Sequence, residues 1–226
     1  MKYRSPHARR QGFTLIELMV VITIIAILAA MSIGVFTFAQ QKAHRDITTT
    51  WSTMLVQALG QYNEKFGEFP DSVNQNSSTT LGQSTTIAGA TYDIDGALVL
   101  YQAITGDGTD QLLLGSTVKG TTSDGTITAD EAKNAIVTDL PKQMTMKVTT
   151  GSGDSYIIVD GFSRPFQYFK GKAADGSNTP VTVNPKYDLW SYAQITNGDG
   201  GGGSMPFQYQ DRISTTGHVN AWIKNW

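Results

Sequence analysis

The first third of the chain carries two hydrophobic patterns that follow one another without a break. No charged residue occurs between Glu17 and Lys42, and residues 18–36 alone approach the roughly 20 residues that a helix needs to cross a bilayer core. Farther on, apolar residues recur at three- and four-residue steps, which is typical of a helix with one apolar face. This stripe consists of Ile47, Trp51, Met54, Leu55, Ala58, Tyr62 and Phe66. We therefore expect one helix over about residues 13–65, apolar all round in its first half and on one face in its second.

The remainder of the chain predicts a small antiparallel sheet with long loops. Short β-branched or aromatic segments bounded by Gly, Pro, Asn and Asp predict strands. They lie at residues 156–160, 166–169, 188–193 and 218–223. Residues 163–165 predict a turn between the first two strands, and residues 94–104 and 129–137 predict short helices. Trp51, Tyr62, Trp190 and Trp222 are expected in a shared core, because aromatic side chains dominate core burial.

These patterns predict an α+β fold in which a long N-terminal helix packs on a small sheet-containing head with long loops. Gly67 and Pro70 are expected to end the helix, by a C-terminal glycine followed by a proline. We divide the chain into a leader, an apolar transmembrane or filament-core helix, an amphipathic stem helix, an inserted variable region and a C-terminal sheet region. Their ranges are 1–12, 13–41, 42–70, 71–153 and 154–226.

One carboxylate stands at the start of the apolar segment. An ionised Glu17 facing hydrocarbon is costly, so it indicates a function that involves a partner. The leader before it carries four basic residues and no acidic one, and such a cluster stays cytoplasmic. An ordinary signal peptide is cleaved after its apolar run, behind small residues. Here the candidate junction, Gly12–Phe13, precedes the run; the alternative is a signal anchor with an incidental glutamate.

Residues 12–17, Gly-Phe-Thr-Leu-Ile-Glu, resemble the processing site of type IV pilins and of the pseudopilins of type II secretion systems. The resemblance implies that a prepilin peptidase cuts between Gly12 and Phe13 and that the new Phe13 amine is N-methylated. It also implies that Glu17 neutralises the amine of an adjacent subunit while the helices pack into a filament. Physical chemistry agrees, because two charges that are expensive alone in an apolar interior become tolerable as a pair.

Four later segments resemble further blocks of this superfamily. Residues 62–70 are similar to its stem end, where a tyrosine is followed by Gly-x-aromatic-Pro. The other three resemble the blocks Asp-Pro-Trp-Gly-x-Pro-Tyr-x-Tyr, Asp-Leu-x-Ser and Ile-x-Asn-Trp of major pseudopilins, at residues 160–168, 187–192 and 223–226. Gly161 and Ser163 depart from the first of these blocks. About residues 71–153 have no counterpart and are interpreted as an expanded insertion.

Composition narrows the function further. The chain has no cysteine, so a disulfide framework is excluded. Removal of the leader changes the formal net charge from −2 to −6, which gives no electrostatic case for a nucleic-acid partner. His7, His44 and His218 are scattered, and the sequence contains no nucleophile elbow, so no active site is suggested. We expect a protein that is not an enzyme and requires no cofactor.

Two segments are candidates for structural calcium. Residues 120–131 contain the back half of an EF-hand loop, with Asp124 and Glu131 at the fifth and twelfth positions but Gly120 and Thr122 where two carboxylates belong. A turn leading into a helix capped by Thr128, with Glu131 three residues later, explains the same sequence. Residues 194–204 lie where the resemblance to major pseudopilins implies a structural calcium ion. Asp199, assisted by Asn197 or Asn220, is the predicted ligand set; a plain flexible loop is the alternative.

The sequence-based hypothesis is a structural subunit, most similar to the major pseudopilin, that polymerises into a helical filament and drives protein export. The expected partners are copies of itself, the prepilin peptidase, the inner-membrane secretion platform and minor pseudopilins. We expect a single pass through the bacterial inner membrane with the head outside the cytoplasm. A type IV pilin forming surface fibres for adhesion, motility or DNA uptake is the second hypothesis, although the cysteine-bridged loop common in such pilins is missing. A membrane-anchored binding module that uses residues 71–153 is the third.

Overall fold

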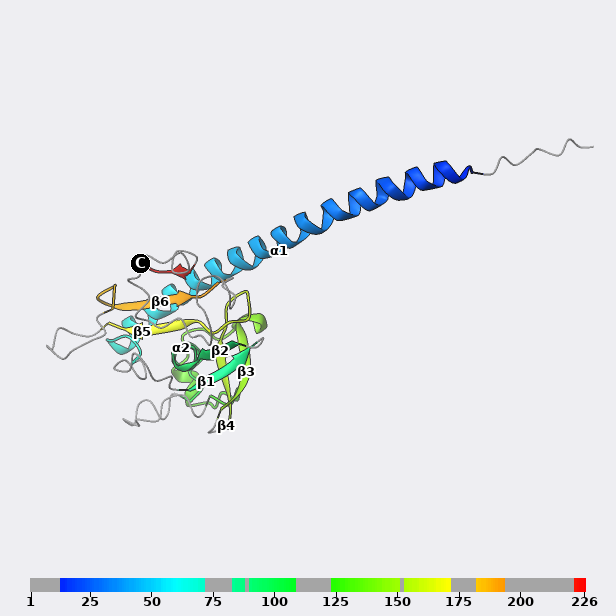
Figure 1. The fold of residues 1–226 in the computed structure, drawn as a ribbon. Coiled ribbons are helices and arrows are strands. Elements are labelled where there is room, and N and C mark those ends of the chain that lie inside the picture. The colour runs from blue at the N-terminus through cyan, green and yellow to red at the C-terminus, as the bar shows by residue number, and fades with distance from the viewer. Residues whose placement is uncertain are drawn as a thin grey trace, which may run out of the picture. The chain divides into compact units, whose positions relative to one another are not determined.

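The structure is a computed structural model of the whole chain. It describes residues 13–71, 83–87, 90–108, 123–150, 153–171, 182–193 and 222–226 (Figure 1). The chain separates into two compact units, Met1–Lys42 and Ala43–Trp226. The architecture is α+β, as predicted: a long N-terminal apolar helix is followed by small antiparallel sheets.

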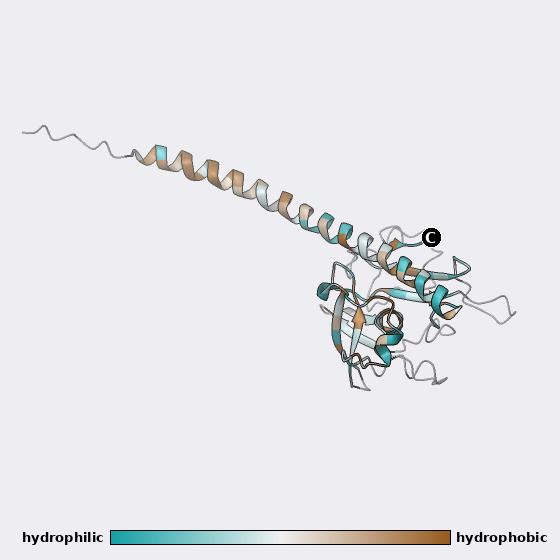
Figure 2. Ribbon diagram, turned by 180° about the vertical axis from the view of Figure 1, so that it is seen from behind, coloured by the Kyte–Doolittle hydropathy of each residue, from teal (hydrophilic) through white to brown (hydrophobic). Residues whose placement is uncertain are grey.

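Helix α1 spans Leu15–Phe66, which confirms the predicted continuous helix. Its most apolar 18-residue window has a mean hydropathy of 2.8, and none of that window is buried, so the segment is long and apolar enough to cross a membrane. The hydropathy changes along the helix, from brown near the N-terminus to mixed colours in the stem (Figure 2). The helix ends where Gly67 adopts a left-handed conformation (φ 81°) and donates its N–H to the carbonyl of Asn63 at 2.8 Å.

The second unit contains three small antiparallel sheets among the residues that the structure describes. Strands β1 and β2 form the first sheet, β3 and β4 the second, and β5, β6 and β7 the third in that order. The strands are Ser84–Ile87, Ala90–Asp93, Thr145–Thr150, Gly153–Ile158, Gln167–Lys170, Tyr187–Ser191 and Ile223–Lys224. Helix α2 spans Asp95–Thr105, and single 3-10 turns occupy Glu131–Lys133 and Lys142–Met144.

Most of the predicted elements are present. The helix over 94–104 and the strands near 156–160, 166–169 and 188–193 correspond to α2, β4, β5 and β6, while most of 218–223 lies outside the described residues. The predicted helix over 129–137 is wrong beyond its first turn. Its backbone leaves the helical path because Ile136 and Val137 both donate their N–H groups to the carbonyl of Ile104, at 2.9 and 3.0 Å.

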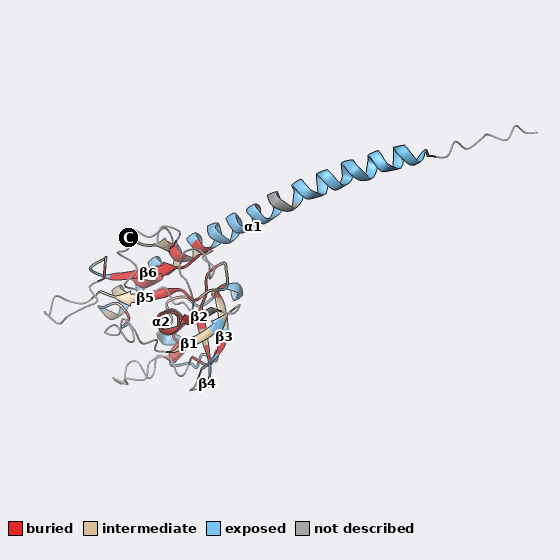
Figure 3. Cartoon of the chain, in the orientation of Figure 1, coloured by how far each residue is buried: buried red, intermediate tan, exposed pale blue. Residues whose placement is uncertain are grey.

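Helix α2 lies at the centre of the second unit, and all eleven of its residues are buried (Figure 3). One face joins the main core, where Leu100 and Ile104 share a cluster with Leu55 and Leu59 of the stem. The opposite face places Leu98 in a second cluster with residues of β3 and β4. The backbone of β5 comes so close to α2 that a Cβ on Gly96 would lie 2.5 Å from the backbone nitrogen of Tyr168. Glycine is therefore required at this helix position.

The stem stripe is shifted by one residue from its predicted start. Ile47 is 41% exposed, whereas the side chain of Thr48 is fully buried. The buried face continues through Leu55, Ala58 and Leu59, with Trp51 partly buried beside it. Thr48 takes the buried place because its hydroxyl oxygen accepts a hydrogen bond from the turn before β5, which an isoleucine could not provide.

The C-terminal aromatic residues form a cluster of their own. Trp190 and Trp222 are stacked with ring centroids 6.1 Å apart, and Tyr192 meets Trp222 edge-on at 5.3 Å. Tyr92 of β2 completes the buried cluster, so the inserted region and the C-terminal sheet share it. The prediction that Trp190 and Trp222 belong to a core is confirmed, although this cluster is separate from the one under the stem.

Candidate functional site

The predicted processing and assembly residues lie at the start of α1. Gly12 is outside the described residues, Phe13 is 87% exposed, and Glu17 occupies the first helical turn. The backbone N–H and the hydroxyl of Thr14 both donate to Glu17 Oε2, at 2.8 and 2.9 Å. In return, Glu17 donates its backbone N–H to the Thr14 hydroxyl at 3.3 Å. This reciprocal arrangement is a capping box, which satisfies N–H groups that a helix start otherwise leaves unpaired.

The capping box gives Glu17 a role that the sequence analysis missed. The signature was visible as Thr14-Leu-Ile-Glu17, a threonine followed three residues later by glutamate. One oxygen of the carboxylate serves the helix start, and Oε1 is not used by it. The same side chain can therefore fix the first turn and present negative charge close to Phe13, the predicted mature N-terminus.

The apolar part of α1 presents large side chains on every side. Leu18, Ile22, Ile25 and Phe36 are each more than half exposed. Hydroxyl groups within this part bond to their own helix: Thr23 donates to the carbonyl of Met19 at 2.8 Å. Burying this much apolar surface requires lipid or other apolar helices, because water cannot solvate it favourably.

A turn before β5 connects the stem to the sheets of the second unit. The carboxylate of Asp160 accepts the N–H groups of Phe162 and Arg164 through Oδ1, at 2.8 and 2.9 Å, and the hydroxyl of Ser191 through Oδ2. Ser163 has a positive φ of 60° and donates its N–H to the carbonyl of Asp160, which confirms a turn here. Burial raises the pKa of Asp160, although these hydrogen bonds and the Arg164 guanidinium oppose the shift.

Hydrogen bonds join the last residues of the chain to β6. Asn225 accepts the N–H of Leu189 through Oδ1 at 2.9 Å and returns its own N–H to the Leu189 carbonyl at 3.1 Å. Asp188, on the same strand, accepts the N–H groups of Val183 and Asn184 at 2.8 and 2.9 Å. The segments Asp-Leu-x-Ser and Ile-x-Asn-Trp, noted separately in the sequence, are thus directly paired in space.

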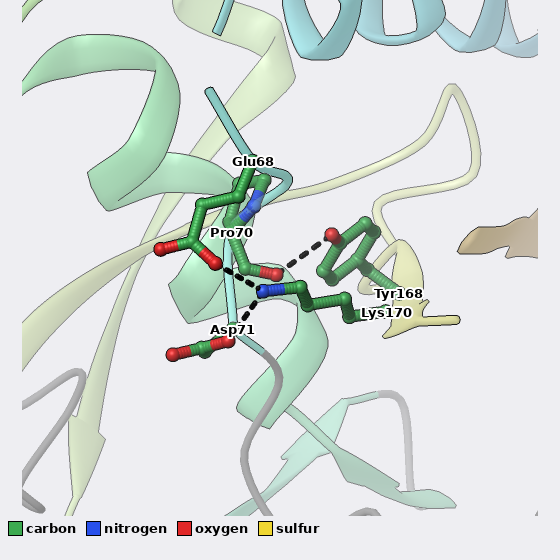
Figure 4. Close-up of polar contacts among 5 residues, drawn as sticks. All are labelled: Glu68, Pro70, Asp71, Tyr168 and Lys170. Atoms are coloured by element: carbon green, nitrogen blue, oxygen red, sulfur yellow. Dashed lines mark hydrogen bonds and ion pairs between the residues drawn. The ribbon is translucent and has the colours of Figure 1, made fainter. Parts of the chain in front are cut away.

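Another set of contacts fixes residues 68–71, which follow the end of α1 (Figure 4). Lys170 on β5 pairs with Glu68 at 2.8 Å and with Asp71 at 2.7 Å. Between these two acids, the carbonyl of Pro70 accepts the hydroxyl of the buried Tyr168 at 2.8 Å. Burial raises the pKa of Tyr168, so its proton is retained and the hydrogen bond is maintained. The chain therefore leaves the stem in a defined direction.

Of the two predicted calcium segments, the structure describes residues 123–131 of the first and none of the second. Asp199, Asn197 and Asn220 lie outside the described residues. Asp124 is exposed, and its Oδ1 accepts the N–H of Thr126 at 2.7 Å. Glu131 accepts the N–H of Thr128 through Oε2 at 2.8 Å, as the capping alternative predicts. In the described part of the chain, there is no group of three or more His, Cys, Asp or Glu side chains that could hold a metal ion.

Asp107 is a buried carboxylate that the sequence analysis did not identify. It follows α2 within Gly-Asp-Gly, accepts the N–H of Gly125 through Oδ2 at 2.8 Å, and leaves Oδ1 without a partner. Burial raises the pKa of Asp107 to about 6; the Gly125 hydrogen bond opposes this shift, while the charges of Asp124 and Glu131 add to it. An aspartate between two glycines directly behind a helix was the available signal.

Comparison with known proteins gives one match. Residues 7–33 match the family described as the prokaryotic N-terminal methylation motif. Searches of curated proteins and of solved structures gave no match. The matched range contains the basic end of the leader, the Gly12–Phe13 junction, Glu17 and most of the apolar segment 13–41. It supports a type IV pilin-like protein with a single membrane-anchoring helix, and the motif implies prepilin peptidase processing and filament assembly in general.

Proposed function

We propose that the chain is the structural subunit of a type II secretion pseudopilus, and that it is the major subunit. The observation that carries the proposal is the order of features at the N-terminus: a basic leader, the Gly12–Phe13 junction, Glu17 and then the apolar helix. The matched motif, residues 7–33, covers the second half of the leader, the junction, Glu17 and most of the apolar segment 13–41. A secretory signal peptide has its cleavage site on the other side of the apolar run. A structural role also requires no active site, and the sequence suggests none.

The C-terminal half supports a pseudopilus over a surface pilus. The blocks that resemble the major pseudopilins meet around β6, where Leu189 pairs with Asn225 and Asp160 accepts the Ser191 hydroxyl. The absence of cysteine argues in the same direction, because surface pilins of this kind commonly close a C-terminal loop with a disulfide.

The mechanism follows from the two halves of α1. After cleavage the apolar half holds the subunit in the inner membrane with its head outside the cytoplasm. The secretion platform then extracts the helix into a filament core, where neighbouring apolar helices replace lipid around it. Glu17 pairs with the Phe13 amine of the adjacent subunit, so that neither charge enters the dry core alone. Addition of subunits at the base lengthens the filament and pushes exported proteins outward.

The test is to image filaments sheared from host cells and to measure protein secretion in a strain that lacks this chain. Short filaments confined to the periplasm, together with loss of secretion, support the proposal. Long surface fibres with unchanged secretion assign the chain to the type IV pilins instead. A mature, membrane-bound protein that forms no filament and interacts through residues 71–153 identifies a membrane-anchored binding module.

A further inference from the structure

Two carboxylates connect the turn behind α2 to the segment at residues 123–131. Asp107 accepts the N–H of Gly125 through Oδ2 at 2.8 Å. In the opposite direction, Glu131 accepts the N–H of Gly108 through Oε1 at 2.7 Å. Each side of the connection therefore supplies one carboxylate and one glycine N–H. We call these two hydrogen bonds, with the four residues that make them, the carboxylate clasp.

The clasp holds a segment that also contacts α2 and the stem. Beyond Glu131, the N–H of Ile136 donates to the carbonyl of Ile104, near the end of α2, at 2.9 Å. The ammonium group of Lys65, in the last turn of α1, donates to the carbonyl of Lys133 at 2.6 Å. A change at the clasp would therefore act on the segment that joins the end of the stem to α2.

The two carboxylates of the clasp differ in their hydrogen bonds. Glu131 accepts backbone N–H groups through both oxygens, from Gly108 and from Thr128, and these bonds outweigh burial and lower its pKa. Asp107 is fully buried, and none of the described residues donates a hydrogen bond to its Oδ1. A buried carboxylate oxygen without a donor makes the ionised form costly. Burial accordingly raises the pKa of Asp107 to about 6.

The charges that face Asp107 from the opposite segment are negative. Asp124 and Glu131 both oppose its ionisation. Lys133, the nearest basic residue along that segment, pairs with Asp130 at 2.7 Å. An ionised Asp107 is therefore repelled by charges on the very segment that it holds through Gly125, whereas a protonated Asp107 is not.

Two tyrosines line the buried side of the clasp. Burial raises the pKa of Tyr101, on α2, so its hydroxyl keeps its proton and favours the ionised form of Asp107 only in part. Tyr156, on β4, is stacked on Tyr101 with ring centroids 5.8 Å apart. Its ring lies against the clasp, because a Cβ on Gly125 would collide with it. These rings surround the carboxylate with apolar surface, and neither tyrosine brings a positive charge to it.

We propose that the carboxylate clasp is a pH-sensitive latch, closed while Asp107 is protonated and loosened when Asp107 ionises. The folded-state pKa of Asp107 lies above its ordinary value of 3.8, so the proton stabilises the folded state. This stabilisation is fully present below pH 3.8 and is lost as the pH rises through about 6. Loosening should increase local opening of residues 123–137, which include the contacts to α2 and to Lys65.

The test is amide hydrogen exchange over residues 123–137 of the full-length protein in detergent, between about pH 5 and pH 7.5. Asp160→Asn serves as the parent, because Asp160 is another buried carboxylate with a raised pKa. Comparison of variants at one pH cancels the intrinsic pH dependence of exchange. Asp107→Asn keeps an acceptor for the Gly125 N–H and removes the charge. It should match the parent near pH 5 and exchange about tenfold more slowly at pH 7.5.

Two exposed acids provide a second variant and a control. Asp124→Asn keeps an acceptor for the Thr126 N–H and removes one charge that repels Asp107. Its loss of protection should therefore begin at a lower pH than in the parent and be smaller at pH 7.5. Asp139→Asn removes an exposed acid eight positions beyond Glu131 and should leave the exchange unchanged at every pH.

Circular dichroism of each variant separates loss of the latch from loss of the fold. Equal exchange of the parent and of folded Asp107→Asn at pH 7.5 would overturn the proposal. Where Asp107→Asn does not fold, Asp124→Asn decides, because its side chain is exposed and its substitution leaves the buried residues in place. An exchange profile of Asp124→Asn identical to that of the parent would then contradict the latch.

Discussion

Gly161 donates its backbone N–H to the hydroxyl oxygen of Thr48 at 3.0 Å, although the two residues are 113 positions apart in the chain. The Thr48 hydroxyl in turn donates to the carbonyl of His44 at 2.7 Å, one helical turn earlier in the stem. The turn at residues 160–164 is thus joined to the stem backbone through the hydroxyl group of Thr48. Asp160 in this turn also accepts the Ser191 hydroxyl. A chain of contacts therefore connects the stem to β6 through five residues: His44, Thr48, Gly161, Asp160 and Ser191.

Gly161→Ala should destabilise the second unit. An added Cβ would lie 2.5 Å from the His44 carbonyl oxygen and 3.0 Å from the Thr48 hydroxyl oxygen, so the turn would have to move away from the stem. Such overpacking costs about 1–3 kcal/mol. Gly60→Ala is the matched control, because a Cβ there meets nothing within 4 Å and alanine favours a helix by about 1 kcal/mol. Chemical denaturation of both variants checks the prediction; equal stability of the two would contradict it.

Asp160 should make the stability of the second unit depend on pH. Because burial raises its pKa, the folded state holds the proton more tightly than the unfolded state. The stabilisation from this proton is fully present below the ordinary carboxyl pKa of 3.8 and is lost as the pH rises through the folded-state pKa. Asp160→Asn retains the acceptor for the Phe162 and Arg164 amides and removes the titration. The free energy of unfolding, measured at several pH values, should fall less steeply with rising pH in Asp160→Asn than in the wild type.

Cleavage should leave Phe13 as the mature N-terminus, carrying an N-methyl group. N-terminal mass spectrometry of protein from a native host provides the measurement, and a mature protein that begins after Ala30 would contradict it. Replacing Gly12 by a bulky residue should block cutting, because the peptidase must approach the backbone closely at that position. Gln11→Ala is a control on the leader side of the junction, where no such restriction is expected.

Asp199→Ala should lower the thermal midpoint of the protein in calcium but not in a chelator. A bound ion stabilises only the folded state, by an amount that grows with the logarithm of its concentration over the dissociation constant. Comparison of melting curves in the two conditions, for wild type and for Asp199→Ala, checks the prediction. Equal calcium dependence of the two proteins would remove Asp199 from the ligand set.

Local and repetitive signals allowed most of the fold to be predicted. The helix over 13–65 follows from a pattern sustained for about fifty residues, and α2 and β4 to β6 follow from short apolar runs between turn residues. Strand β3 was missed because Thr145–Thr150 is largely polar, and only its pairing with β4 makes it a strand. Strands β1 and β2 were missed for the same reason, since they lie in a polar stretch that reads as a loop.

The candidate sites show the same difference between residues that a local pattern identifies and residues that only the fold brings together. Gly12, Phe13 and Glu17 were identifiable because their motif is contiguous. Asp107 was not, because its hydrogen-bond partner Gly125 lies 18 positions beyond it, and only the fold brings the two together. The capping contact of Thr14 lies between these two cases. Its signature, a threonine followed three residues later by Glu17, is contiguous in the sequence, but the same glutamate also fits a role in pairing with another subunit.

The capping box makes the test of Glu17 sharper than a single substitution to leucine. Glu17→Leu should preserve membrane insertion and cleavage after Gly12, since it makes the segment more apolar and leaves the leader unchanged. Filament assembly should fail or slow sharply, because the Phe13 amine of the neighbour would enter the filament core unpaired. Glu17→Asp should be milder but not neutral, since the charge remains and its reach shortens.

However, leucine removes two things at once: the negative charge and the acceptor for the Thr14 N–H. Glu17→Gln and Thr14→Ala separate them. Glutamine keeps an acceptor for the capping box without the charge, whereas Thr14→Ala keeps the charge and removes the reciprocal hydroxyl contact. If charge pairing drives assembly, Glu17→Gln should fail like Glu17→Leu, and Thr14→Ala should assemble. The measurement is the yield of sheared filaments relative to mature membrane-bound protein. The reverse result would assign Glu17 to fixing the helix start, and the pairing mechanism would then be wrong for this protein.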